Sequence, residues 1–126
     1  EALLNNKSPV INGDGSHSRD FTYIDNAIQA NVRALFTENK EALNQVYNIA
    51  CGEQTTLNEI FEVLKTEAAS KLEPVYGPER KGDVKHSLAD ISKAKRLLGY
   101  EVGVTVKEGM KRTFQWYKRR SLGSEV

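Results

Sequence analysis

Two short loops carry the side chains best suited to bind a charged ligand. The first, residues 13–21 (GDGSHSRDF), places Arg19 after a turn with two glycines, and the second, residues 79–87 (ERKGDVKHS), holds Arg80 and Asp83. A guanidinium is a planar donor that forms paired hydrogen bonds with phosphate. An ionised carboxylate accepts hydrogen bonds from neighbouring hydroxyls, such as those of a ribose. Two arginines and one carboxylate therefore have the chemistry required to bind a nucleoside diphosphate.

A solvated surface is the alternative for both loops. Arg19 has Asp20 and Asp25 nearby in the sequence, and Arg80 is flanked by carboxylates of its own loop. Exposed ion pairs of this kind contribute less than about 1 kcal/mol and need not serve a function. The residue types alone leave both interpretations open.

The other reactive residue types do not form a recognisable catalytic or metal site. His17 and His86 are the only histidines, and no group of histidine, cysteine and carboxylate residues has the spacing of a zinc site. The chain also lacks G-x-S-x-G and G-x-G-x-x-G sequences, which are typical of serine hydrolases and of dinucleotide-binding turns. Cys51 is the single cysteine, and we expect an inert, buried thiol there.

The overall charge is nearly balanced. The 126 residues include 18 Lys and Arg against 17 Asp and Glu, a formal net charge of +1. This gives no support for a nucleic-acid or membrane-surface partner, which would require a basic patch. No apolar run approaches the roughly 18 residues of a membrane helix, and no signal peptide is visible. We therefore expect a cytoplasmic protein with neither kind of partner.

The hydrophobic pattern predicts a small mixed α/β fold. Helices are expected at about 26–38, 57–71, 91–98 and 106–118, and short strands at 9–13, 19–24, 46–50 and 72–77, with residues 1–6 as the end of a further helix. Strands so few and short do not build a well-covered sheet by themselves. We expect residues 1–120 to form one lobe that packs on further protein, and residues 121–126 to form a flexible tail.

Capping signals mark the helix starts. Asp25 and Asp90 are expected to cap the first and third helices. Thr56 with Glu59 matches a capping box at the start of the second helix, and Thr105 with Glu108 matches another before the last.

Apolar stripes predict which helix faces are buried. On the first helix the stripe consists of Ile28, Val32, Leu35 and Phe36. On the last helix it consists of Val106, Met110, Phe114 and Tyr117, and Trp116 beside it is expected to pack as well.

Three stretches, taken in order, resemble a known family. Residues 13–26 resemble the pattern G-D-G-x-x-x-R-D-F-x-Y-[VI]-[DE]-[DN], residues 46–61 resemble YN-[IL]-[AG]-x-G…[ST]-[LV]-x-E-[IL], and residues 80–100 resemble R-x-G-D-[VI]-x-x-x-x-[AY]-D-x-[ST]-K-A-x-x-x-L-G-[YW]. These patterns are typical of the nucleotide-sugar epimerases and dehydratases of the extended short-chain dehydrogenase/reductase family. The resemblance covers about residues 1–118.

The resemblance is to the C-terminal, substrate-binding part of such proteins. Their N-terminal part is a doubly wound NAD-binding domain with a Gly-rich loop and a catalytic Tyr-x-x-x-Lys pair. No tyrosine of this chain has a lysine four positions later. The resemblance therefore implies that the catalytic residues and the NAD site lie upstream, with none in this chain. It also implies that the complete protein is a homodimer formed through the NAD domain.

The resemblance assigns substrate contacts position by position. Arg19 and Arg80 are implied to contact the diphosphate of a UDP-sugar, and Asp83 to hold the ribose hydroxyls. Backbone groups of Val10 and Asn12 are implied to hold the uracil.

Ser87 is implied to set the choice of sugar. Family members limited to plain hexoses often place a tyrosine here, against the C2 side of the sugar, whereas a serine leaves room for an acetamide. The sequence around Ser87 resembles that of UDP-N-acetylglucosamine 4-epimerases. The alternatives to such a 4-epimerase are a 4,6-dehydratase, a decarboxylase, or a nucleotide-sugar-binding lobe without catalysis. The alternative for Ser87 is an ordinary loop residue.

Overall fold

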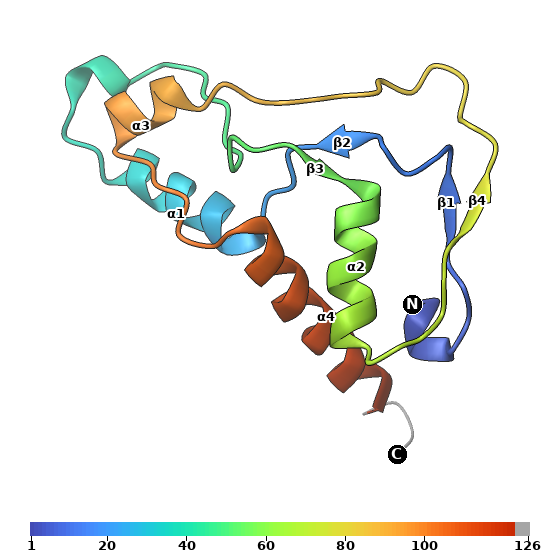
Figure 1. Ribbon diagram of the computed structural model, residues 1–126. Coiled ribbons are helices and arrows are strands. Elements are labelled where there is room, and N and C mark those ends of the chain that lie inside the picture. Colours follow the sequence, from blue (N-terminus) through green and yellow to red (C-terminus); the bar gives the residue numbers. More distant parts are fainter. Residues whose placement is uncertain (123–126) are drawn as a thin grey trace.

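The chain folds as a small α/β unit of four α-helices and two separate short pairs of strands (Figure 1). The structure is a computed structural model and describes residues 1–122. In chain order the elements are η1 (Leu3–Asn5), β1 (Val10–Asn12), β2 (Ser18–Arg19), α1 (Ile24–Leu35), η2 (Lys40–Ala42), β3 (Thr55–Thr56), α2 (Leu57–Glu67), β4 (Val75–Gly77), α3 (Ser92–Leu98) and α4 (Val106–Leu122). The predicted fold class is confirmed.

The strands form two separate pairs rather than one sheet. β1 and β4 are parallel, with Val10 opposite Val75 and Asn12 opposite Gly77. β2 and β3 are antiparallel, with Ser18 opposite Thr56. The predicted strands at 9–13 and 72–77 are thus confirmed. Of the strand predicted at 19–24, only Arg19 is in a strand, since β2 ends there and α1 begins at Ile24.

α2 packs against α4 and carries the capping box expected at its start (Figure 1). The Thr56 hydroxyl accepts a hydrogen bond from the Glu59 backbone N–H at 3.2 Å, and the Thr56 N–H donates to Glu59 Oε2 at 2.7 Å. Phe61 of α2 and Phe114 of α4 are both buried. The exchanged hydrogen bonds fix the direction in which the chain enters α2, directly after β3.

A second core lies between α1, α3 and the segment 46–50. Its buried members are Ala30, Ala50, Ile91, Ala94 and Tyr100, with Tyr47 and Ile49 packed against them. The Tyr100 hydroxyl donates to the carbonyl of Ala50 at 2.7 Å. This core holds the segment 46–50 in place, although the segment pairs with no strand among the described residues and the strand predicted there is wrong.

Asn26 joins α1 to the loop that precedes α4. Its side chain is only 1% exposed and donates to the carbonyl of Val104 at 2.7 Å. Its Oδ1 accepts from the backbone N–H groups of Gly103 and Val104 at 3.1 and 3.0 Å. One buried side chain thereby satisfies three backbone groups of the loop that precedes α4.

Of the other predicted caps, one is wrong and two are formed only in part. α1 has Tyr23 at its N-cap, and Asp25 lies in the first turn, where its carboxylate is 3.4 Å from Arg112 Nη1. α3 begins after Ile91, although Asp90 Oδ1 accepts from the Ser92 N–H at 2.9 Å. Glu108 donates its N–H to the Thr105 hydroxyl, but its carboxylate binds Arg112 instead of returning to Thr105. The carboxylates of Asp25 and Glu108 pair with Arg112 instead of completing the expected caps.

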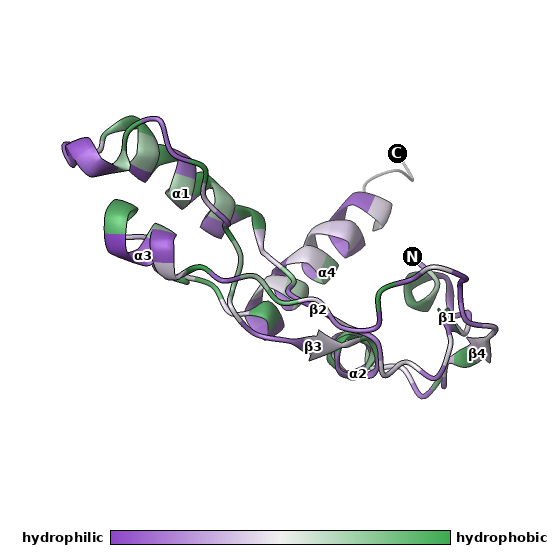
Figure 2. Cartoon of the chain, turned by 90° about the horizontal axis from the view of Figure 1, so that it is seen from above, coloured by the Kyte–Doolittle hydropathy of each residue, from purple (hydrophilic) through white to green (hydrophobic). Residues whose placement is uncertain are grey.

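The stripe predicted to bury α1 is exposed. Ile28, Val32, Leu35 and Phe36 are between 48% and 76% exposed, while Asn26 and Ala30 occupy the buried face. Figure 2 shows hydrophobic residues along the length of this helix. The described residues therefore leave the apolar face of α1 without a packing partner, as expected of a lobe that packs on further protein.

α4 fits its predicted stripe only in part. Val106 and Phe114 are buried, but Trp116 and Tyr117 are 48% and 52% exposed, so their expected packing is wrong. The helix continues through Leu122 and includes the first residues of the expected tail, whereas residues 123–126 lie outside the described residues. None of the helices among residues 1–122 is long and apolar enough to cross a membrane.

We expect Asn26→Leu to destabilise the protein strongly. Leucine has a similar volume but leaves one carbonyl and two N–H groups buried without partners, a loss of roughly 2–4 kcal/mol in unfolding free energy. Urea unfolding of wild type, Asn26→Leu and the control Asn31→Ala, whose amide is exposed on the same helix, measures it. Equal stability of Asn26→Leu and Asn31→Ala would refute this role.

Candidate functional site

The two arginine-bearing loops meet along β2. The Ser18 N–H donates to the carbonyl of Lys85 at 3.0 Å, and the Ser87 N–H donates to the carbonyl of Ser18 at 3.2 Å. Ser18 and His86 thus form a parallel bridge, and the Ser18 hydroxyl lies 2.9 Å from His86 Nδ1. In Figure 1 the long segment from β4 to α3 passes alongside β2. Residues nearly 70 positions apart are therefore held side by side by backbone hydrogen bonds.

Arg19 lies between the two loops. Its Nη1 donates to the carbonyls of Ser18 at 2.8 Å and Lys85 at 3.3 Å. Its Nη2 is 3.8 Å from Asp83 Oδ1, and the two side chains are 32% and 44% exposed. The surface pairing of Arg19 with Asp20 or Asp25 is wrong, because Arg19 reaches across to the second loop. An ion pair this long and this exposed is weak, so an anionic ligand can compete for the guanidinium.

Arg80 and Asp83 occupy one turn of the second loop. The Asp83 N–H donates to the carbonyl of Arg80 at 3.2 Å, and Gly82 has a φ of +87° with open space where a side chain would be. Arg80 is exposed and forms no ion pair with any residue in 1–122. The structure thus brings Arg19 and Asp83 together and places Arg80 at the other end of the Asp83 turn.

β1 leads into the first loop and β4 into the second. Because β1 and β4 are parallel, Val10 and Asn12 lie on the strand next to the one that ends at the charged loop. The Gly13 N–H donates to the carbonyl of Gly77 at 2.9 Å, and a Cβ at Gly13 would come within 3.1 Å of Glu79 Cγ. Both loops therefore begin at the same end of the β1–β4 pair.

The turn at residues 13–16 is fixed against α2. Asp14 Oδ1 accepts from the Ser16 N–H at 2.9 Å, and the hydrogen bonds from Ser16 hold the pKa of Asp14 below its ordinary value. The Asn58 N–H donates to the carbonyl of Gly15. Gly15 has a φ of +74°, and a Cβ there would lie 2.0 Å from Asn58 Oδ1, so only glycine fits. This rigid turn sets the path from β1 to Arg19.

Ser87 lies at the end of the bridge to β2, and its side chain is exposed. Its position is fixed through its backbone, so the side chain can change without loss of the bridge. Ser87 is therefore placed on the same short stretch as Asp83 and beside the strand that carries Arg19.

Asp20 is the residue that the sequence reasoning missed. Its carboxylate accepts backbone N–H groups from Cys51 and Gly52 at 2.9 Å each and from Ala89 at 3.4 Å. The sequence indicated Asp20 only as an ion-pair partner of Arg19. No local pattern distinguishes the two roles, because all three donors are more than 30 positions away.

Cys51 is partly buried beside Asn26 and does not resemble a reactive thiol. Its sulfur is 3.7 Å from Asn26 Nδ2 and 3.9 Å from the carbonyl of Val104. Burial, followed by the negative charge of Asp20, raises the pKa of the thiol above its ordinary value. The protonated form is favoured, which agrees with the expected inert thiol.

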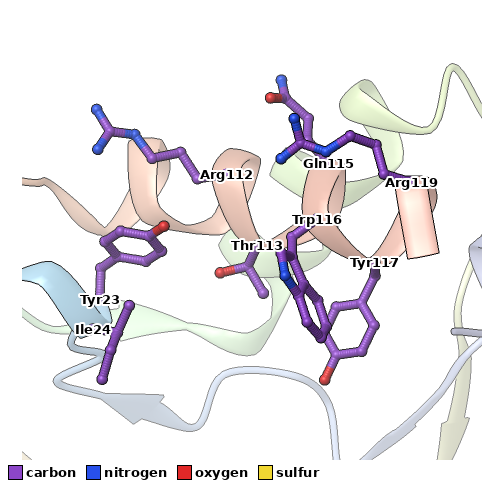
Figure 3. Close-up of a pocket in the computed structure, with 8 residues that line it drawn as sticks. All are labelled: Tyr23, Ile24, Arg112, Thr113, Gln115, Trp116, Tyr117 and Arg119. Carbon is purple, nitrogen blue, oxygen red and sulfur yellow. The ribbon is translucent and has the colours of Figure 1, made fainter.

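A separate hollow of about 450 Å³ lies between the start of α1 and α4 (Figure 3). Trp116 and Tyr117 line it with their rings 4.9 Å apart in an edge-to-face arrangement, and Arg112 lies over the ring of Tyr23. None of the candidate ligand-binding residues lines this hollow. Within residues 1–122 no group of histidine, cysteine and carboxylate side chains is arranged to hold a metal ion.

Comparison with known families assigns the chain to a family of sugar-nucleotide enzymes. The sequence model of the family described as GDP-mannose 4,6 dehydratase matches residues 1–113. The chain belongs to this family, the NAD-dependent nucleotide-sugar epimerases and dehydratases.

Solved structures of UDP-sugar 4-epimerases are similar to this fold. A UDP-glucose 4-epimerase from Thermotoga maritima, solved with UDP-glucose, is 40% identical with a TM-score of 0.85, over 95% of this chain and 37% of that one. A UDP-N-acetylglucosamine 4-epimerase from Methanobrevibacter ruminantium, solved with UDP-N-acetylmuramic acid, is 36% identical with a TM-score of 0.84, over 94% and 37%. A UDP-glucuronic acid 4-epimerase variant from Bacillus cereus, solved with NAD and a fluorinated UDP-sugar, is 34% identical with a TM-score of 0.85, over 94% and 37%.

The chain spans just over a third of the length of the relatives that it matches. These relatives act on different UDP-sugars, so family membership by itself does not select a substrate.

Proposed function

We propose that this chain is the nucleotide-sugar-binding lobe of an NAD-dependent UDP-hexose 4-epimerase that interconverts UDP-N-acetylglucosamine and UDP-N-acetylgalactosamine. The observation that carries the proposal is the bridge between Ser18 and His86, which brings Arg19 to within 3.8 Å of Asp83. A cation and a carboxylate in contact, both partly exposed, suit a ligand in which a phosphate and a ribose are neighbours.

Each candidate residue has a separate part in binding. Arg19 and Arg80 bind the diphosphate from two sides of the Asp83 turn. The Asp83 carboxylate accepts the ribose hydroxyls, while the backbone of β1 at Val10 and Asn12 holds the uracil. The weak ion pair between Arg19 and Asp83 is exchanged for contacts with the ligand on binding.

The lobe contributes positioning rather than bond-breaking chemistry. NAD, which we place in the remaining two thirds of the protein, would accept a hydride from the sugar C4 and return it to the opposite face. In that reaction the sugar must turn while the rest of the substrate stays fixed. The residues of this lobe keep the substrate in place by binding its UDP part. Binding energy from a part of the substrate that does not react is thereby used to orient the sugar.

Ser87 selects the N-acetylated sugar. Its small side chain is exposed beside the bridge that fixes Asp83 and Arg19 on the same surface. A tyrosine at this position would add the volume of a ring to that surface, while serine leaves space for an acetamide group. The similar structures include 4-epimerases of UDP-glucose, UDP-N-acetylglucosamine and UDP-glucuronic acid, so the choice of sugar in this proposal rests on Ser87.

The direct test is proton NMR of UDP-N-acetylglucosamine incubated with the full-length protein and NAD. We expect new anomeric signals from UDP-N-acetylgalactosamine. Conversion of UDP-glucose alone would refute the proposed substrate but keep 4-epimerisation. Loss of signal to a 4-keto-6-deoxy or decarboxylated product would establish a dehydratase or decarboxylase instead, and binding without any conversion would establish a non-catalytic lobe.

We expect Arg80→Ala and Arg19→Ala each to weaken UDP binding about tenfold or more, because each removes a charge-assisted hydrogen bond to phosphate. Isothermal titration calorimetry of the full-length protein with UDP measures the change. Lys81→Ala is the matched control, because it removes the same charge from the same exposed loop. If Lys81→Ala weakens UDP binding as much as Arg80→Ala, the loss comes from the overall positive charge of the loop, and the proposed contact between Arg80 and the diphosphate is wrong.

We expect Ser87→Tyr to lower kcat/KM for UDP-N-acetylglucosamine about tenfold or more relative to UDP-glucose, because the ring occupies the acetamide space. The ratio of the two kcat/KM values is the readout, and Ser87→Ala, which keeps the space open, is the control. An unchanged ratio in Ser87→Tyr would remove position 87 from the specificity determinants.

A further inference from the structure

Asp20 connects three segments that are far apart in the sequence. Its Oδ1 accepts the Cys51 N–H at 2.9 Å, and its Oδ2 accepts the Gly52 N–H at 2.9 Å and the Ala89 N–H at 3.4 Å. Hydrogen bonds to an ionised acceptor are stronger than those between neutral groups. One side chain thus ties the end of β2 both to the turn at 51–52 and to the segment that follows Ser87.

The bond to Ala89 continues the bridge between the two loops. In a parallel pairing, N–H groups of alternate residues on one strand bind the facing strand. Ser87 binds the Ser18 carbonyl in this way, and the next N–H in the series, that of Ala89, binds the Asp20 side chain rather than a backbone carbonyl. The carboxylate therefore extends the pairing by one step at the point where β2 ends at Arg19.

Before Ala89, the second loop has few other attachments. Between β4, which ends at Gly77, and α3, which begins at Ser92, the only regular pairing within residues 1–122 is the bridge at His86. The turn at 51–52, in contrast, follows Ala50, which is buried in the core with Tyr100. Ala89 packs against the same core and Ile91 is one of its buried members. Asp20 therefore joins the end of β2 to two segments that the core already holds, the turn at 51–52 and the segment that follows Ser87.

We propose that Asp20 is a positioning residue, which fixes the separation between Arg19 and the Asp83–Ser87 segment and so sets the affinity for the diphosphate without touching it. This inference rests on the proposed function. The Asp20 carboxylate accepts from three donors, whereas Nη2 of the neighbouring Arg19 has only a long ion pair with Asp83, which a ligand can replace.

The test is Asp20→Asn in the full-length protein. The amide keeps one acceptor oxygen but turns an NH₂ group toward backbone N–H groups, so at least one of the three bonds is lost. We expect the Kd for UDP to rise about tenfold, and KM for the UDP-sugar to rise with a smaller change in kcat, because uniform binding is lost rather than chemistry. Hydrogen exchange in the segment 85–90 is expected to accelerate.

Asp90→Asn is the matched control. Asp90 Oδ1 also accepts a backbone N–H at 2.9 Å, that of Ser92, but the bond lies within one loop and joins no distant segments. A purely structural loss would lower the melting temperature of both variants and leave the UDP affinity of the folded protein unchanged. Asp20→Glu keeps the charge and both acceptors at a greater reach, and an intermediate Kd would indicate that the position of the segment sets the affinity.

A double mutant separates positioning from direct binding. If Asp20 acts through Arg19, Asp20→Asn adds little loss of affinity to Arg19→Ala, whereas independent contributions would add. An unchanged Kd in Asp20→Asn, with weakened binding in Arg19→Ala, would overturn this inference and leave the proposed function standing. Unchanged UDP binding in both Arg19→Ala and Arg80→Ala would overturn the proposed function and this inference with it.

Discussion

The candidate site depends on the pairing of β2 with the segment around His86. Two backbone hydrogen bonds, from Ser18 to Lys85 and from Ser87 to Ser18, bring together loops that are separated by about half of the chain. Without these hydrogen bonds Arg19 and Asp83 would lie on separate exposed turns, and the two side chains could not bind one ligand together. Because the backbone pairing holds the two loops together, the side chains of Arg19 and Asp83 are not needed for that purpose and can interact with a ligand.

Local structure was predictable where its cause is local. The capping box of Thr56 and Glu59 and the two short strands at 9–13 and 72–77 each follow from a few neighbouring residues. The prediction failed where a distant group decides the outcome. Asp25 signals a cap but pairs with Arg112, and residues 46–50 have the composition of a strand but find no partner strand in the described part of the chain.

The same distinction applies to the site. Residue types and spacing were enough to select Arg19, Arg80 and Asp83 as candidates for binding a nucleoside diphosphate. They were not enough to show that Arg19 faces Asp83 rather than Asp20, because that contact spans more than 60 positions. The role of Asp20 was invisible for a related reason, since its partners are backbone N–H groups and carry no side-chain signature.

The apolar stripe of α1 has no packing partner among the described residues, and the chain spans just over a third of the length of its relatives. Burying large apolar side chains stabilises a protein by about 25 cal/mol per Å², yet this lobe leaves Ile28, Leu35 and Phe36 more than half exposed. The buried face of α1 is held instead by Asn26, whose polar bonds orient the helix without using the apolar stripe. A helix that is fixed by polar bonds on one face and apolar on the other leaves that apolar face free to pack on further protein.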